Sequence, residues 1–255
     1  MDPADRGDAA EELCRGLDDA AASARLGIES GGLAFWVAAL RECFEEAGVL
    51  LAQPRDAAAG TDVLDTSDPD VRARFEAHRR EINEGRTGLL AVCREEGLVL
   101  AADAVHHVGH WITPELSPKR FDTRFFVTTA PAGQVAHHDD GETIATIWVR
   151  PSDALARFEA GEIALLPPTV DSLEKLGAHT STEAVMAWAR AITDIPTILP
   201  IVLFEDGRLL ILRPGDDGYE QALEDRMASS DPVSPELAAA ARPRRARSAG
   251  SSGCR

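Results

Sequence analysis

The order of apolar and polar residues divides the first 50 positions into two predicted helices. Leucines and alanines recur at helical spacing over residues 8–25, which predicts one amphipathic helix with an apolar side. Glycines between positions 27 and 32 end this helix. A bulky apolar run begins a second helix at Phe35, and its size predicts a face buried against a sheet. Gly48 ends the second helix, because glycine readily adopts the left-handed conformation of a helix C-terminus.

The segment at about 52–96 is predicted to be a helical insertion. Its first part, residues 52–68, is rich in Ala, Gly and Asp, a composition typical of a surface loop. An Asp-Pro pair then begins the first of two predicted helices, which we expect at about 70–83 and 87–96.

The rest of the pattern predicts strands, then helices and a hairpin. Runs of β-branched and aromatic residues predict the strands, and Ser, Thr or Asp before a periodic apolar segment predicts each helix start. The turn Glu-Asp-Gly joins the two strands of the hairpin. We expect strands at 98–100, 104–112, 125–127 and 143–149, helices capped by Ser152 or Asp153, by Thr169 and by the capping box 180–183, and a hairpin of 198–204 with 208–212.

The composition sets the number of domains. The chain has 255 residues, of which 44% are hydrophobic and 27% charged, so it is long enough for one sizeable domain or two small ones. We expect one domain over residues 1–226. Ser, Pro, Ala and Arg dominate residues 227–255, which predicts a disordered tail. Its arginines either contact the acidic body or a partner, or they belong to a solvated tail without a role.

The charge and the cysteines exclude several classes of protein. The net charge of -17 and the pI of about 4.8 argue against nucleic-acid binding, which depends on clustered Lys and Arg. A small nucleotide-like ligand stays compatible with this charge, since a metal ion brings positive charge. The four cysteines have no close spacing and predict reduced thiols. No apolar run reaches the ~20 residues that span a bilayer, so we expect a cytoplasmic protein without membrane contacts.

Three glutamates of the second helix are the strongest candidates for chemistry. At 3.6 residues per turn, Glu42, Glu45 and Glu46 share one helix face. Like charges at these spacings repel each other, although Arg41 is placed to pair with Glu45. A hard divalent cation such as Mg²⁺ or Mn²⁺ takes carboxylate oxygens and compensates for the repulsion. The alternative is an amphipathic helix with a solvated acidic edge.

These residues resemble the second half of the Nudix box, Arg-Glu-apolar-x-Glu-Glu-x-Gly-apolar, and residues 41–49 match it at every position. The resemblance implies that Glu42, Glu45 and Glu46 are catalytic and bind the metal. It also implies that Arg41 orients them through an ion pair. Members of the family cleave a nucleoside diphosphate linked to another group, by metal-assisted attack of water on a phosphorus atom.

The first half of the box does not match, since Leu33 stands where the family has glutamate. Residues 1–5 instead resemble those that follow the Pro-Gly-Gly of one Nudix subfamily, which is related to the peroxisomal coenzyme A diphosphatase. In that subfamily an insertion, here residues 6–38, precedes the Arg-Glu helix. The hypothesis is that this chain lacks the N-terminal strands and box glycines that its relatives carry.

Two further segments resemble the same subfamily, Trp-Ile-Thr-Pro-Glu at 111–115 and Arg-Phe-Asp-Thr-Arg-Phe-Phe at 120–126. Arg120 and Arg124 are candidate phosphate contacts, because a guanidinium fits phosphate oxygens bidentately. The alternative is a structural salt bridge from Asp122 to one of the two arginines.

A further acidic residue is expected from outside the box. Glu142 precedes the Trp-Val-Arg-Pro segment 148–151, at a position where the subfamily has a recurrent acidic residue, so it is the candidate base or additional metal ligand. Asp139 and Asp140 compete with it, and an exposed acidic turn is the alternative without chemistry. Leu-Pro-Pro-Thr at 166–169 also matches the subfamily.

Together the matching segments imply an α/β (α+β) fold, a Nudix-like α/β/α sandwich with a mixed sheet and a helical insertion. They imply a metal-dependent hydrolase that cleaves a diphosphate linkage in a nucleoside diphosphate derivative. The subfamily suggests coenzyme A or an acyl derivative as substrate, and the wider family suggests sugar nucleotides or dinucleotides. The alternatives are a Nudix-like nucleotide-binding or regulatory module without turnover, and a fragment with compromised folding. The oligomeric state stays open, with a homodimer among the options.

Overall fold

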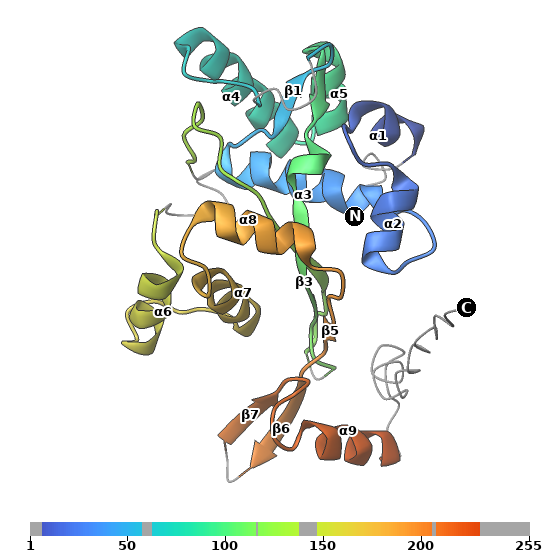
Figure 1. The fold of residues 1–255 in the computed structure, drawn as a ribbon, viewed down its shortest axis with the longest axis vertical. Coiled ribbons are helices and arrows are strands. Elements are labelled where there is room, and N and C mark those ends of the chain that lie inside the picture. Colours follow the sequence, from blue (N-terminus) through green and yellow to red (C-terminus); the bar gives the residue numbers. More distant parts are fainter. Residues whose placement is uncertain (1–6, 58–62, 116, 138–146, 206–207, 230–255) are drawn as a thin grey trace, which may run out of the picture. The chain divides into compact units, whose positions relative to one another are not determined.

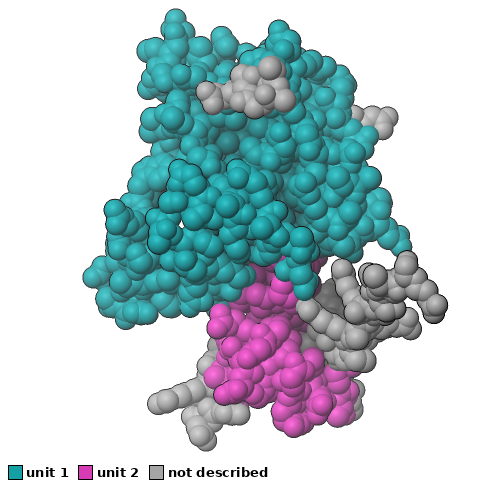
Figure 2. All heavy atoms as spheres, in the orientation of Figure 1, with its two compact units in different colours: residues 1–109, 124–194 teal, residues 110–123, 195–255 magenta. Residues whose placement is uncertain are grey.

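The structure of the chain is a computed structural model, and it combines helices with strands, which confirms the α/β class. Two compact units make up the chain (Figure 2): a first unit of residues 1–109 and 124–194, and a second unit of residues 110–123 and 195–255. The structure describes residues 7–57, 63–115, 117–137, 147–205 and 208–229.

Helices dominate the first unit, and a hairpin with one helix dominates the second (Figure 1). The helices of the first unit are α1 Asp8–Leu13, α2 Asp19–Leu26, α3 Leu33–Ala47, α4 Pro69–Asn83, α5 Leu89–Glu95, α6 Pro151–Glu159, α7 Pro167–Gly177 and α8 Thr182–Ala191, with strands β1 Ala52–Pro54 and β2 Leu98–Leu100 and a 3₁₀ turn at Ala102–Ala104. Strands β3 His106–Ile112 and β4 Asp122–Val127 run through both units, and the second unit adds β5 Thr197–Ile198, β6 Ile201–Glu205, β7 Arg208–Leu212 and α9 Tyr219–Ala228.

Three small sheets hold these strands. β1 and β2 pair antiparallel, with Ala52 opposite Leu100. β3 lies between β4 and β5, and its pairing with β5 is parallel. β6 and β7 form the predicted hairpin, which begins at Ile201 rather than at 198. The expected loop at 52–68 was placed too early. Its first residues, 52–54, form β1, and their backbone N–H and C=O groups find hydrogen-bond partners by pairing with β2.

The prediction of one helix over residues 8–25 is also wrong, because α1 and α2 share this stretch. Between them the chain is extended at Cys14, which forms a parallel bridge to Leu100, and the N–H of Arg15 donates to the Leu100 carbonyl. Asp18 then begins α2 and caps its first turn through its carboxylate. Pairing with the distant strand β2 is thus more favourable here than continuing the helix through Cys14. The local spacing of apolar residues does not reveal such a long-range pairing.

The predicted helix starts in the second half of the chain have different outcomes. α6 and α7 begin with a proline in the first turn and without a side-chain cap, so Ser152, Asp153 and Thr169 lie inside the helices and are not caps. Proline replaces capping there, because its φ suits the first turn and it has no N–H to satisfy. α8 starts at the predicted box, where the hydroxyl of Ser181 accepts a backbone N–H.

The later part of the chain contains one helix that was not predicted and two expectations that the described residues cover only in part. α9 was not predicted, and it packs Tyr219 into the core of the second unit, where the Tyr219 hydroxyl donates to the Leu199 carbonyl at 3.0 Å. Of the strand expected at 143–149, residues 147–149 are exposed and lie outside any strand, and the rest falls outside the described residues. The predicted tail also lies outside them from residue 230 onward.

The core of the first unit is built around α3, which contacts α1, α2 and α4. Trp36 is fully buried, and its indole N–H donates to the carbonyl of Val105 at 3.0 Å. Its ring meets Phe126 edge-on, with 4.9 Å between centroids. A buried tryptophan needs a partner for its N–H, so these contacts fix both the depth and the rotation of α3. No helix in the described part of the chain is long and apolar enough to cross a membrane.

Candidate active site

Helix α3 presents a buried face and an outward face, as its periodicity predicts. The buried face is apolar and includes Leu40 and Phe44. On a helix with 100° per residue, Phe35, Glu42 and Glu46 fall on the opposite side. Gly48 ends the helix with φ of 68° and donates its N–H to a carbonyl of the last turn, which confirms the predicted stop.

Arg41 holds two of the three carboxylates. Its Nη1 lies 2.6 Å from Oε2 of Glu45 and its Nη2 lies 2.6 Å from Oε1 of Glu42, which confirms the predicted ion pair with Glu45. The side chains of Arg41 and Glu45 are 17% and 20% exposed, while that of Glu42 is 51% exposed. Such pairs contribute at most about 1 kcal/mol to folding stability. Their main effect is therefore to orient the two carboxylates.

Arg79, which was not among the candidates from the sequence, binds the C-terminus of α3. Its Nε donates to the carbonyl of Glu45 at 2.9 Å, and its Nη2 donates to the carbonyls of Glu46 at 2.8 Å and of His137 at 3.1 Å. The Arg79 residue is only 6% exposed. A signal existed in the sequence, because this arginine occupies a helical-spacing position on the apolar side of α4. A cation at a helix C-terminus also complements the helix dipole.

The N-terminus of α3 is held by a residue from another helix. Gly32 precedes α3 and offers no side-chain cap. Asp19 of α2 takes its place: Oδ1 accepts from the N–H of Leu33 at 3.0 Å, and Oδ2 accepts from the N–H of Gly31 at 2.8 Å. These two backbone hydrogen bonds, the one from Leu33 first, lower the pKa of the Asp19 carboxyl below its ordinary value of 3.8.

The acidic face also acts on a neighbouring thiol. Cys43 is partly buried and packs against the core. Burial raises the pKa of the Cys43 thiol, and the negative charge of Glu46 raises it further. Cys43 is therefore a protonated thiol that fills an apolar position of the motif.

The carboxylates fit a hard divalent cation by their chemistry. The oxygen ligands that Mg²⁺ and Mn²⁺ take are offered by Glu42, Glu45 and Glu46. Arg41 balances only one of these three negative charges, so a cation would still be attracted to the segment. Within the described ranges, no three His, Cys, Asp or Glu side chains already converge as a metal site. Binding a cation there therefore requires the three carboxylates to come closer together, and Arg41 engages one oxygen of Glu42 and one of Glu45.

Of the two arginines proposed for phosphate contacts, Arg124 lies beside the carboxylate helix. Its guanidinium carbon stacks 4.4 Å from the centroid of the Phe35 ring. Phe35 precedes Glu42 by two helical turns on the outward face, or roughly 10 Å along the axis. Arg120 belongs to the second unit, where its Nε donates to the carbonyl of Thr113 at 2.9 Å.

The remaining sequence candidates do not add a residue to the site on α3. Asp122 was the suggested salt-bridge partner of an arginine, and its Oδ1 lies 2.6 Å from Nε2 of His110. Glu142, Asp139 and Asp140 lie outside the described residues, so the proposed base stays a prediction.

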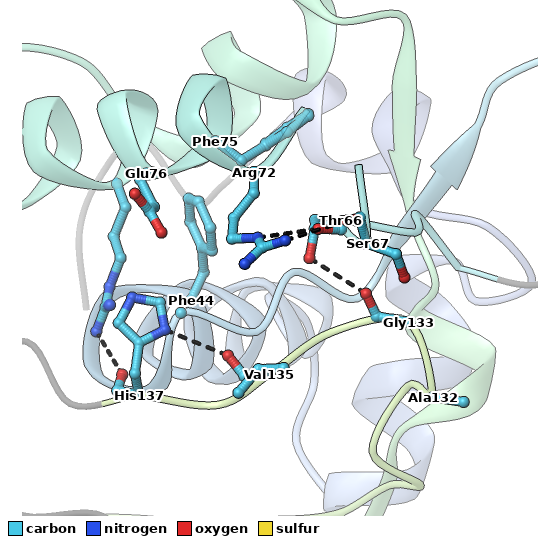
Figure 3. Close-up of a pocket in the computed structure, with 12 residues that line it drawn as sticks. Phe44, Thr66, Ser67, Arg72, Phe75, Glu76, Ala132, Gly133, Val135 and His137 are labelled. Atoms are coloured by element: carbon cyan, nitrogen blue, oxygen red, sulfur yellow. Dashed lines mark hydrogen bonds between the residues drawn. The ribbon is translucent and has the colours of Figure 1, made fainter. Parts of the chain in front are cut away.

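A pocket of about 500 Å³ lies at the C-terminal end of α3 (Figure 3). The end of α3, residues 66–67, one face of α4 and residues 132–137 line it. Arg72 projects from α4 into this space, and Arg79 forms part of the same wall. The volume is in the range typical of small-molecule sites.

Comparisons with known proteins identify the family of the segment that contains this helix. The family model for the NUDT19 Nudix domain matches residues 18–176, which include the whole of α3. The human acyl-coenzyme A diphosphatase NUDT19 is 30% identical over 191 residues, which are 73% of this chain and 51% of that protein. The Gallus gallus acyl-coenzyme A diphosphatase NUDT19 is 29% identical over 202 residues, which are 75% of this chain and 53% of that protein.

A solved structure gives the same assignment of the fold. The crystal structure of a NUDIX hydrolase from Alicyclobacillus acidocaldarius aligns with a TM-score of 0.52 and 26% identity, over 73% of this chain and 76% of that one. The expected Nudix-like architecture is thereby confirmed. The chain spans about half the length of the curated relatives that it matches.

Proposed function

Because the chain belongs to the NUDT19 Nudix domain family, we propose that it is a metal-dependent hydrolase that cleaves a diphosphate linkage in a nucleoside diphosphate derivative. Coenzyme A or an acyl-coenzyme A is the substrate that the named relatives suggest. One observation carries the proposal: Arg41 holds the carboxylates of Glu42 and Glu45 together on α3, inside the segment that the family model matches.

Each residue has a proposed role in this reaction. Glu42, Glu45 and Glu46 would hold Mg²⁺ or Mn²⁺, and the bound ion would supply charge neutralisation of the diphosphate and a water of lowered pKa. Arg41 orients the carboxylates, and Arg124 contacts phosphate oxygens from its position over Phe35.

The remaining roles come from the sequence. Arg120 is proposed as a second phosphate contact, and Glu142 as the base that accepts the proton of the attacking water. Water adds to one phosphorus atom and the diphosphate bond breaks, so the products are two phosphate monoesters. A single domain over residues 1–226, a cytoplasmic location and the homodimer option stay predictions.

The test is release of phosphate monoesters from coenzyme A, an acyl-coenzyme A, ADP-ribose and sugar nucleotides, with Mg²⁺ or Mn²⁺ and with EDTA. The chain is compared with Glu45→Gln and with Glu81→Gln, which removes the same charge from an exposed position on α4. We expect turnover that EDTA abolishes and that Glu45→Gln lowers about 100-fold or more, while Glu81→Gln leaves it unchanged.

Two other results would change the conclusion. An equal loss of turnover in Glu45→Gln and Glu81→Gln would show that Glu45 has no specific role in the reaction. No turnover from a folded chain that still binds one of these compounds would favour the nucleotide-binding module without catalysis.

A further inference from the structure

The walls of the pocket at the end of α3 are fixed by hydrogen bonds between segments far apart in the sequence. The amide of Gln134 bonds the backbone of Leu50 in both directions at 2.8 Å and donates to the Leu64 carbonyl at 2.7 Å. The N–H of Thr66 donates to the Gly133 carbonyl at 3.0 Å. These bonds make the pocket a preformed cavity within the first unit, so little ordering is needed for a ligand to bind.

The face of α4 that lines the pocket carries Arg72, Glu76 and Arg79 at spacings of four and three residues (Figure 3). Arg72 donates through Nε and Nη2 to the carbonyls of Thr66 and Ser67 at 3.3 and 3.1 Å. A guanidinium has five N–H groups, so Arg72 retains donors beyond these two bonds.

Two charged groups in the pocket have capacity for a ligand. Arg72 is exposed and Glu76 is half-buried, so water reaches both side chains, and within the described residues the Nη1 group of Arg72 and the carboxylate of Glu76 have no hydrogen bond or ion pair that would compete with a ligand. A small number of charged groups beside apolar rings in a cavity of this size is typical of a small-molecule site. Phe44 and Phe75 supply the apolar part of the lining.

This combination selects the chemistry of the ligand. A guanidinium binds a phosphate, a carboxylate accepts from an amino group, and aromatic rings contact a flat ring. A phosphorylated adenosine offers all three, because its base carries an exocyclic amine. The pantetheine arm of coenzyme A has no anionic group for Arg72.

The position of the pocket on α3 decides which part of a substrate it receives. The carboxylates proposed for the reaction project from the outward face, whereas Phe44 lines the pocket from the opposite face, at the end of the helix. The pocket is therefore suited to an end group of the substrate and not to the diphosphate that is cleaved.

We propose that this pocket binds the 3′-phosphoadenosine end of the substrate, with Arg72 on the 3′-phosphate and Glu76 on the amine of the adenine. The inference rests on the proposed function for its substrate class. It makes Arg72 a specificity residue that favours coenzyme A over its dephospho form, which lacks the 3′-phosphate.

The test measures binding of adenosine 3′,5′-bisphosphate and of adenosine 5′-phosphate by calorimetry, without metal, so that it does not depend on turnover. Variants are Arg72→Gln and Glu76→Gln, with Arg80→Gln and Glu81→Gln as controls that remove the same charges from exposed positions of α4. Thermal melting shows whether each variant is folded. If Arg72→Gln does not fold, Glu76→Gln still tests whether the pocket binds the adenine.

We expect Arg72→Gln to weaken binding of the bisphosphate about 10- to 100-fold and to leave the 5′-phosphate nearly unchanged, because only the 3′-phosphate loses its partner. Glu76→Gln should weaken both ligands, and the two controls neither. In the hydrolase assay, Arg72→Gln should lower the kcat/KM ratio of coenzyme A to dephospho-coenzyme A by the same factor.

The outcomes separate this inference from the proposed function. Binding that depends on Arg72, in a chain without turnover, would support the pocket and overturn the hydrolase. Metal-dependent turnover of coenzyme A, with bisphosphate binding equally weakened in Arg72→Gln and Arg80→Gln or absent from the unaltered chain, would overturn the pocket alone.

Discussion

Arg79 on α4 donates from its Nε to the carbonyl oxygen of Glu45 on α3, over 2.9 Å. The helix that carries the candidate metal ligands is thus closed at its C-terminal end by a buried cation from the next helix. At the other end, Asp19 of α2 accepts backbone N–H groups around Leu33. Both charges have the sign that complements the dipole of α3.

The first prediction concerns the stability that Arg79 supplies. Arg79→Gln should lower the free energy of unfolding by roughly 2–3 kcal/mol, because charged hydrogen bonds to several carbonyls are lost in a buried position. Urea unfolding of the variant measures the change. Arg80→Gln on the exposed side of the same helix is the control, with an expected effect within about 0.5 kcal/mol. Equal effects from the two variants would contradict this role for Arg79.

The second prediction follows the pKa of Asp19. Because its backbone hydrogen bonds lower the pKa of the folded state below 3.8, its stabilising contribution is present above that pH and is lost as the pH falls through the folded value. Asp19→Asn should cost about 1 kcal/mol at pH 7, the usual size of an N-cap effect. The deficit should shrink toward zero at acid pH, where the carboxyl of the unaltered chain is also protonated. Unfolding curves from pH 7 to about pH 2 test this, and a deficit that stays constant over the whole series would count against it.

The third prediction separates orientation from stability at Arg41. Its ion pairs are partly exposed, so Arg41→Gln should change the free energy of unfolding by less than about 1 kcal/mol. The variant should nevertheless lower kcat strongly and raise the concentration of Mg²⁺ or Mn²⁺ needed for half-maximal activity, because Glu42 and Glu45 lose their common anchor. Activity at a series of metal concentrations measures the shift. A variant that is destabilised but normal in its metal requirement would assign Arg41 to the fold alone.

The fourth prediction concerns Arg124, which stacks on Phe35 of the carboxylate helix. If it contacts substrate phosphate, Arg124→Gln should raise KM about 10-fold or more, since a charge-assisted hydrogen bond is lost. Arg94→Gln on the exposed side of α5 provides the matched control. Initial rates over a range of substrate concentration give the answer, and unchanged KM would leave Arg124 as a packing residue.

The fifth prediction concerns two thiols, that of the buried Cys93 and that of the partly buried Cys14. Burial raises the pKa of the Cys93 thiol to about 12, and also that of Cys14 to about 12. Both should resist iodoacetamide at pH 8 in the folded chain and react after denaturation, because the thiolate is the nucleophile. Both thiols hold protons more tightly in the folded state than in the unfolded state. Stability should therefore fall as the pH rises above about 9. Mass spectrometry of alkylated peptides provides the measurement, and rapid labelling of folded Cys93 would contradict its burial.

The local part of this architecture could be predicted from the sequence. The stop of α3 at Gly48 and the ion pair of Arg41 with Glu45 depend on residues within four positions of one another, whereas α3 starts at Leu33, ahead of the predicted Phe35. Helical spacing and the left-handed preference of glycine are properties of short segments, so periodicity determines them. The hairpin and the start of α8 are confirmed for the same reason.

Only the tertiary structure decided what holds and surrounds that helix. The break at Cys14 follows from pairing with Leu100, and the ends of α3 are fixed by Asp19 and Arg79, which lie 14 and 34 residues from their partners. The pocket is lined by residues from 44–48, 66–79 and 132–137, which are far apart in the sequence. Such contacts depend on how distant parts of the chain close on one another, and no window of neighbouring residues contains that information. The sequence therefore determined the chemistry that α3 carries, and packing determined how that chemistry is held.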